Sequence, residues 1–196
     1  NRAIVSDGVV DILDEVGLKK PDLQVLSPEF MEEVKKLKQK NLAAELLKKL
    51  LRDEIHVRFK RNVVETQRFS DMLQNSFNRY QSRFISLIQL LEELMKIAED
   101  IRSSQHKGQK LNLTEDELAF YDALAENESA VQVLGDENLR IMAKLLVVRV
   151  RANTSIDWTI KESARAKLRV IVKKVLRQYG YPPDKQEAAV ETVLEQ

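Results

Sequence analysis

Hydrophobic residues recur along most of this chain at the spacing of an α-helix, and this pattern predicts an all-α fold. The most regular stretch has apolar positions at alternating intervals of four and three: Leu73, Phe77, Tyr80, Phe84, Leu87, Leu91, Leu94, Ala98 and Ile101. Such a heptad seam is typical of a helix that packs lengthwise against a partner. It predicts one long central helix over about residues 70–103, which would span roughly 50 Å.

The side chains in this seam favour a helical bundle over a dimeric coiled coil. Phe77, Tyr80 and Phe84 are bulky, and they suit the interior of a bundle better than a slim two-stranded coil. We therefore expect a bundle of about six to eight helices around the long one. It would form a single helical domain over residues 1–196, which could divide into sub-lobes 1–112 and 113–196.

Short motifs mark the ends of the predicted helices. Ser27 precedes Pro28 and an acid, which is a typical helix start, and residues 114–117 form a capping box. The polar, glycine-bearing residues 103–112 predict a loop. Gly135 predicts a break before a central helix over residues 138–151. Gly180, followed by two prolines, predicts the end of a helix.

The helix that ends at Gly180 carries many basic residues on one side. Its apolar residues share the other side: Leu168, Ile171, Val172, Val175, Leu176 and Tyr179. The basic face has three interpretations, namely a solvated surface, a contact to the DNA backbone, or a docking face for an acidic protein partner. The candidate interaction residues are Trp158, Lys167, Arg169, Lys173, Lys174 and Arg177.

The charge of the chain is nearly balanced overall but strongly segregated along its length. The 196 residues are 32% charged with a net charge of +1. Residues 35–61 carry ten basic and three acidic residues, a net +7, and residues 161–177 carry seven bases and one acid, a net +6. Residues 114–138 carry eight acids and no base, a net −8. These blocks can neutralise one another within the fold or face external partners.

The composition also limits the cellular setting. The chain has no cysteine, which excludes disulfides, thiolate metal sites and a cysteine nucleophile, and a reducing cytoplasm fits this composition. We find neither a membrane-spanning run nor a signal-peptide pattern. Because the sequence opens at Asn1 without an initiator Met, we expect it to be a piece of a longer chain.

Motifs that would carry catalysis or hold a cofactor are missing from the pattern. Five scattered glycines do not form a phosphate-binding loop, and His56 and His106 lack metal-ligand spacing. A nuclease site would need acidic residues on adjacent strands, and the sequence predicts no strands. We therefore predict no catalytic, cofactor-binding or metal-binding residue, and no enzyme activity for these residues alone.

Five segments that cover nearly the whole chain resemble one family. They are "VVDILDEVGLKKPDLQVLSPEFMEEV" (9–34), "QKNLAAELLKKLLRDEI" (39–55), "KRNVVETQRFSDML" (60–73), "FYDALAENESAVQVLGDENL" (120–139) and "DWTIKESARAKLRVIVKKVLRQYGYPPDKQEAAVETVLEQ" (157–196). The chain resembles the C-terminal helical region of the R (motor and restriction) subunit of type I restriction–modification enzymes. The last segment is the longest and the most specific.

The resemblance implies a non-catalytic part of an enzyme. In that family an Mg²⁺-dependent nuclease and an ATP-driven DNA translocase precede the helical region, so ATP and Mg²⁺ are expected only upstream of these residues. The implied role is to dock this motor onto the methyltransferase (M) subunit. The alternative is a clamp that contacts the backbone of the translocated double-stranded DNA.

Overall fold

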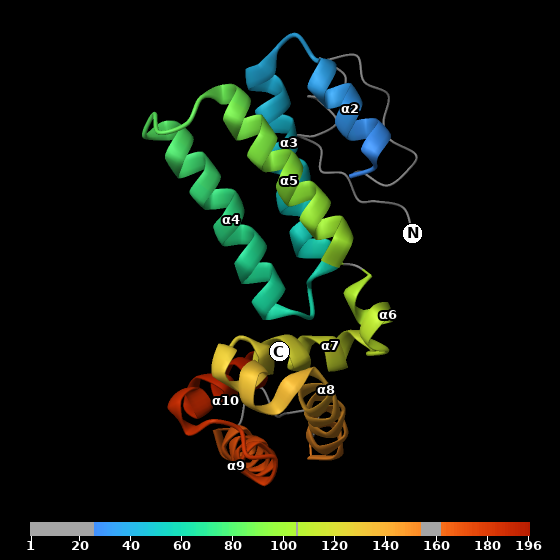
Figure 1. Ribbon diagram of the computed structural model, residues 1–196, viewed down its shortest axis with the longest axis vertical. Coiled ribbons are helices and arrows are strands. Elements are labelled where there is room, and N and C mark those ends of the chain that lie inside the picture. The colour runs from blue at the N-terminus through green and yellow to red at the C-terminus, as the bar shows by residue number, and fades with distance from the viewer. Residues whose placement is uncertain (1–25, 105, 154–161) are drawn as a thin grey trace. The chain divides into compact units, whose positions relative to one another are not determined.

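The computed structural model describes residues 26–104, 106–153 and 162–196, and among these it contains helices and no β-strand (Figure 1). The predicted all-α fold class is therefore confirmed. The helices are α2 Pro28–Lys36, α3 Lys40–Arg58, α4 Val63–Gln81, α5 Leu87–Ser104, α6 Lys107–Leu111, α7 Glu115–Ala125, α8 Glu128–Asn153, α9 Glu162–Gln178, the 3₁₀ turn η1 Pro183–Lys185 and α10 Gln186–Glu195. None of the described helices has the length and apolarity that a bilayer crossing requires.

The chain divides into two compact units. Unit 1 comprises the described residues up to Lys60 together with Thr66–His106, and unit 2 comprises Arg61–Glu65 together with Lys107–Gln196. The first turn of α4 thus belongs to unit 2 and the remainder of α4 to unit 1. The predicted sub-lobes 1–112 and 113–196 stay a prediction.

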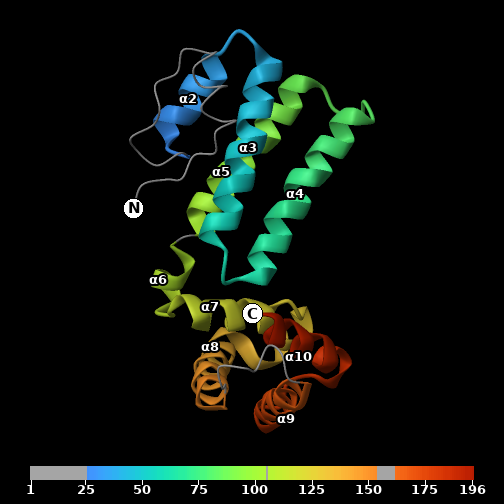
Figure 2. The ribbon, with the colours of Figure 1, turned by 180° about the vertical axis from the view of Figure 1, so that it is seen from behind.

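Unit 1 is held together by an apolar core between α3 and α5, to which α2 and α4 contribute (Figures 1 and 2). Its fully buried large side chains are Leu46, Leu47, Leu50, Leu51, Ile55, Phe69, Leu90, Leu94 and Ile101. The rings of Phe59 and Phe69 stack with their centroids 5.1 Å apart. The predicted helix start is confirmed, since Ser27 Oγ accepts a hydrogen bond of 3.2 Å from the backbone N–H of Phe30.

The predicted single helix over residues 70–103 is wrong, because the chain turns between α4 and α5. A second capping box lies inside the heptad seam: Ser86 Oγ accepts from the N–H of Gln89 at 3.3 Å, and Gln89 Oε1 accepts from the N–H of Ser86 at 2.8 Å. Apolar spacing continues across this turn because both helices bury their faces in the same core. The apolar spacing alone therefore predicted one helix where the chain forms two, α4 and α5, with Ser86 at the start of the second.

The turn at the end of α4 is a Schellman motif. The N–H of Phe84 donates to the carbonyl of Arg79 at 2.9 Å, and the N–H of Arg83 donates to the carbonyl of Tyr80 at 3.0 Å. Arg83 has φ 60°, the left-handed conformation that this position requires and that glycine usually supplies. The motif directs Phe84, predicted in the seam, into solvent, where it is 81% exposed.

Unit 2 is a ring of four helices in which α7 packs on α8, α8 on α9, α9 on α10 and α10 on α7. The predicted capping box of α7 is confirmed, since Thr114 and Glu117 exchange side-chain-to-backbone hydrogen bonds. The predicted loop over residues 103–112 is wrong over most of its length, since α5 continues to Ser104 and a further helix follows. Residues 107–111 form α6, whose Gly108 is buried tightly enough that a Cβ would lie 3.2 Å from the carbonyl oxygen of Leu113.

The predicted break at Gly135 is confirmed as a kink within α8, where this residue has φ 73° and ψ 165°. Beyond the kink, Leu139 and Leu146 are buried, but Ile141 and Val148 are exposed. The expectation that apolar residues around most of this helix place it at the centre of the fold is therefore wrong. Its neighbours, α7 and α9, leave part of its surface uncovered.

Helix α9 ends in a second Schellman motif, as Gly180 predicts. The N–H of Tyr181 donates to the carbonyl of Leu176 at 2.9 Å, and the N–H of Gly180 donates to the carbonyl of Arg177 at 3.1 Å. Gly180 has φ 69°. Here the following aromatic residue is buried, and the Tyr181 hydroxyl donates to the carbonyl of Leu124 at 2.8 Å.

Candidate interaction surface

The basic side of α9 faces partly towards α10, and two of its candidate residues are engaged there. Arg169 pairs with Glu191, and Lys173 Nζ lies 2.5 Å from an oxygen of Glu187. Both basic side chains are consequently only partly exposed. The hydrogen bond from Lys173, with the positive charges of Lys173 and its neighbours, lowers the pKa of the Glu187 carboxyl.

The remaining basic candidates of α9 face solvent. Lys167, Lys174 and Arg177 are exposed, and no ion pair forms on them within the described residues. Val170 lies on the same exposed side and is 66% exposed. Trp158 falls outside the described residues. The interaction role of these residues stays a prediction.

The acidic block over residues 114–138 meets different bases from those of α9. Arg61 lies 3.5 Å from Asp116, which also pairs with Arg151, and Arg140 lies 3.0 Å from Asp136. Part of the segregated charge in unit 2 is thus neutralised within the fold. A surface of paired charges attracts a polyanion such as DNA less than a free basic cluster does.

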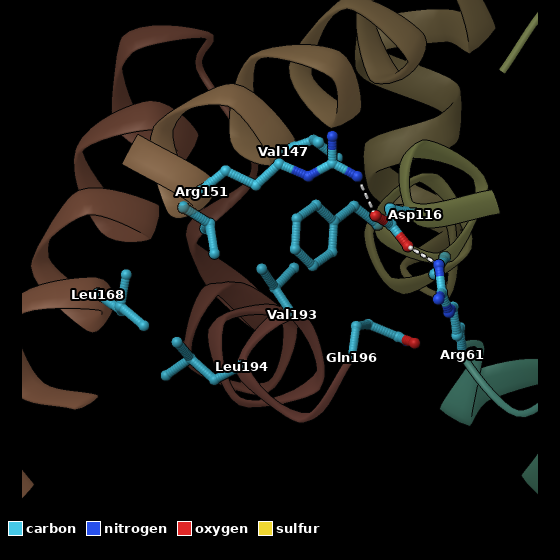
Figure 3. Close-up of a pocket in the computed structure, with 11 residues that line it drawn as sticks. Arg61, Asp116, Val147, Arg151, Leu168, Val193, Leu194 and Gln196 are labelled. Atoms are coloured by element: carbon cyan, nitrogen blue, oxygen red, sulfur yellow. Dashed lines mark hydrogen bonds and ion pairs between the residues drawn. The ribbon is translucent and has the colours of Figure 1, made fainter. Parts of the chain in front are cut away.

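A small apolar pocket lies in unit 2 between α7, α8, α9 and α10 (Figure 3). Its volume is about 210 Å³, and its walls are formed by Ala119, Phe120, Val147, Val150, Leu168, Val193 and Leu194. Pockets for drug-sized ligands usually hold roughly 300–1,000 Å³. This pocket therefore has room for one or two side chains or a small apolar molecule.

The rim of this pocket carries charges that bind one another. Figure 3 shows the guanidinium groups of Arg61 and Arg151 on either side of the Asp116 carboxylate. The residues that line the pocket include no histidine, serine or lysine, and the one carboxylate among them, Asp116, is paired with two guanidinium groups. In chemical terms the pocket offers apolar contact and a polar edge.

Among the described residues the most buried charged side chains, those of Glu65 and Asp122, lie near the start of α4 in unit 2. Lys107 Nζ lies 2.5 Å from an oxygen of Asp122 and 3.8 Å from one of Glu65, and Asn62 Nδ2 donates to Asp122 at 2.7 Å. Asn62 also accepts from the N–H of Glu65 and so caps α4. Both carboxylates are almost inaccessible to solvent. Their pairing with Lys107 joins the beginnings of α4 and α6 to the last turn of α7.

Sequence reasoning missed both the pocket and this polar cluster. Asn62, Lys107 and Asp122 are far apart in the chain and carry no spacing that would connect them. Among the described residues no three metal-ligating side chains gather, so neither His56 nor His106, both of unit 1, belongs to such a group. The exposure of Phe84 was also missed. The Ser-x-x-Gln pattern at residues 86–89 could have indicated it, because a helix that begins at this point places Phe84 in the preceding turn.

Comparison with known proteins gives one family and two relatives. A family model described as "Type I restriction enzyme HindI endonuclease subunit-like, C-terminal" matches residues 1–196. The "Type I restriction enzyme HindI endonuclease subunit" of Haemophilus influenzae is 38% identical over 196 residues, all of this chain and 19% of the relative. The "Putative type I restriction enzyme MjaIXP endonuclease subunit" of Methanocaldococcus jannaschii is 31% identical over 187 residues, 92% of this chain and 17% of the relative. No solved structure matches the chain.

Proposed function

The chain belongs to the C-terminal family of HindI-like type I restriction endonuclease subunits, and from this premise we propose that it is an assembly module that holds the endonuclease subunit to the methyltransferase subunit of the same enzyme. The observation that carries the proposal is the family match itself. The matched proteins are named as subunits, and the chain spans less than a fifth of either relative. In this proposal nuclease and ATPase chemistry, with ATP and Mg²⁺, belongs to the rest of the subunit, and the complex works in the cytoplasm.

The described residues support an assembly role in their chemistry. The buried charges of unit 2 are paired with one another, and the pocket of that unit is apolar with a polar edge. Several large apolar side chains are nevertheless exposed, of which Phe84 is the most accessible. Exposed apolar side chains with charged neighbours are typical of protein–protein interfaces, which combine an apolar centre with a polar rim.

The proposal is tested by retention of the 196-residue chain on the immobilised methyltransferase subunit of its own restriction system. We expect a stable complex that elutes as one species in size-exclusion chromatography. The complete endonuclease subunit serves as the positive control. If the complete subunit is retained and the chain is not, the docking contact lies elsewhere and the proposal fails.

The same preparation distinguishes docking from a DNA clamp. Titration of duplex DNA into the chain should give weak binding, because Arg169, Lys173 and Arg61 already pair with acids. A clamp that contacts six phosphates would instead lose about 10³-fold in affinity between 50 and 200 mM salt. Tight binding with that salt dependence would favour the clamp.

A further inference from the structure

One end of unit 1 presents apolar side chains that the fold leaves uncovered. Phe84 is 81% exposed and Ile88, in the first turn of α5, is 64% exposed. Figures 1 and 2 show the turn between α4 and α5 at the same end of unit 1 as the connection between α2 and α3. We call residues 38–40 and 80–88 the unit 1 tip.

The backbone holds Phe84 outward by hydrogen bonds on both sides. The Schellman motif fixes the chain as it leaves α4, and the Ser86 to Gln89 capping box fixes it as it enters α5. The residue at the Phe84 position of a Schellman motif commonly packs back on the preceding helix. Phe84 is instead accessible to solvent, so its ring is free for contact with another molecule.

The neighbouring residue carries backbone strain. Arg83 has φ 60°, a conformation that is unfavourable for an L-residue with a long side chain. A glycine would make the same turn without strain. Strained backbone beside an exposed aromatic side chain is the combination expected where selection acts on binding rather than on stability.

The charge around the apolar residues is positive. A groove on the tip is lined by Tyr80, Gln81, Arg83, Phe84, Ile85 and Ser86. A second groove is lined by Lys38, Gln39, Lys40, Asn41, Leu42, Glu45 and Leu87. Together they contain three basic residues and one acid. Arg83 and Lys38 form no ion pair within the described part of the chain, whereas Arg79 pairs with Glu93 at 2.6 Å.

We propose that the unit 1 tip docks into an acidic-rimmed apolar recess on a protein partner, with Phe84 as the anchor. The inference rests on the proposed function, which makes the methyltransferase subunit that partner. A buried aromatic side chain at the centre and complementary charge at the rim is the usual anatomy of a specific protein interface. The bases around Phe84 match acids on the partner.

Other occupants fit the tip less well. A second copy of this chain would bring the same bases against Lys38 and Arg83, and like charges repel. Duplex DNA would satisfy the bases but would leave the exposed ring of Phe84 and the side chain of Ile88 without an apolar contact. The combination of apolar centre and basic surround therefore favours an acidic protein surface.

The test measures the affinity of the 196-residue chain for the methyltransferase subunit of its own system. We expect Phe84→Ala to weaken binding at least tenfold, since a central anchor of an interface dominates its affinity. The matched control is Val148→Ala, which also truncates an exposed apolar side chain, 64% exposed and on α8 of unit 2. The control should change the affinity by less than twofold, and both variants should keep the circular dichroism spectrum of the parent chain.

Charge reversal supplies a second readout that truncation does not give. Lys38→Glu combined with Arg83→Glu should slow association about tenfold at low salt, with a smaller effect at high salt. Reversal of two exposed lysines in unit 2, Lys110→Glu with Lys185→Glu, is the matched control and should leave the rate within twofold.

The outcomes separate the two proposals. If the parent chain binds and Phe84→Ala binds equally well, the tip is not the docking surface and the proposed function stands. If the parent chain does not bind while the complete endonuclease subunit does, the proposed function fails and the tip inference fails with it. Self-association or duplex binding that Phe84→Ala abolishes would identify a different occupant and overturn the tip inference alone.

Discussion

The ends of α4 and α9 make the same turn and use it in opposite ways. Both close with Schellman hydrogen bonds, and in both an aromatic residue follows the left-handed position. At the end of α9 that position is Gly180, and Tyr181 is 3% exposed. At the end of α4 it is Arg83, and Phe84 lies in solvent.

The difference shows that a backbone motif does not determine what its side chains contribute. Tyr181 turns inward, packs in the core of unit 2 and binds the carbonyl of Leu124 through its hydroxyl. Phe84 contributes almost nothing to the burial in unit 1, and the turn in front of it is strained. The turn at the end of α9 stabilises the fold, whereas the turn at the end of α4 leaves an aromatic side chain free to contact another molecule.

Truncation of the two aromatic residues should give the largest contrast. Tyr181→Ala removes a buried ring and its hydrogen bond, so we expect a loss of about 3–5 kcal/mol in the free energy of unfolding. Phe84→Ala should stay within about 0.5 kcal/mol of the parent. Urea unfolding followed by circular dichroism measures both. Equal losses would mean that Phe84 is part of the core.

Alkaline pH should destabilise the chain through Tyr181. Burial is the main cause that raises the pKa of the Tyr181 phenol to about 12, above the ordinary value of about 10. Below about pH 10 both the folded and the unfolded state keep the proton, and the full stability is present. Between about pH 10 and 12 the unfolded state loses the phenol proton while the folded state keeps it. The free energy of unfolding therefore falls by up to about 1.4 kcal/mol per pH unit.

The variant Tyr181→Phe isolates this effect. It should be about 1 kcal/mol less stable at neutral pH because the carbonyl of Leu124 loses its partner, and its stability should fall less steeply above pH 10. Burial also raises the pKa of Tyr121, which contributes to the slope in both proteins. The measurement is therefore the difference between the two pH profiles. Identical profiles would contradict the inward role of Tyr181.

Substitutions at the two left-handed positions, residues 180 and 83, should change the free energy of unfolding in opposite directions. Gly180→Ala places a Cβ at φ 69° and should cost about 1 kcal/mol, although the Cβ itself meets no atom within 4 Å. Arg83→Gly removes the strain at φ 60° and should gain about 0.5 kcal/mol, since part of the relief is offset by the freer unfolded chain. Thermal unfolding of both variants tests the pair. A loss for Arg83→Gly would show that the Arg83 side chain stabilises the turn.

The smallest expected effect concerns the ion pairs between α9 and α10. Lys173→Met should lower the free energy of unfolding only slightly, because Glu187 is largely exposed and water screens the pair. The loss should shrink as salt is added, since the ions weaken the same attraction. A loss that does not respond to salt would indicate that the aliphatic part of Lys173 matters more than its charge.

Local patterns in the sequence predicted most of the helices correctly. The caps at Ser27 and Thr114, the kink at Gly135 and the end of α9 at Gly180 all depend on neighbouring residues, and all are confirmed. The division of the long seam into α4 and α5 was missed because a shared core gives both helices compatible apolar spacing. The Ser86 capping box is the local feature of the sequence that distinguishes two helices from one long helix.

The candidate sites were less predictable because they are made by distant residues. The pocket in unit 2 combines residues of four helices, and the cluster around Asp122 joins side chains 60 and 15 positions away in the chain. The pairing of Arg169 and Lys173 depends on how α10 packs against α9. Nothing in the spacing of basic residues on one helix reveals the acids of another.

The kink at Gly135 has a genetic consequence. Its dihedral angles fall where an L-amino acid is strongly disfavoured, even though the space around its Cα is open to a Cβ. Every missense change that one nucleotide can make in a glycine codon introduces a side chain, so each would disfavour the bend that reorients α8 before Asp136. A saturation library at codon 135, sorted for folded chains by resistance to a protease, should therefore be depleted of all replacements, with no correlation to their size.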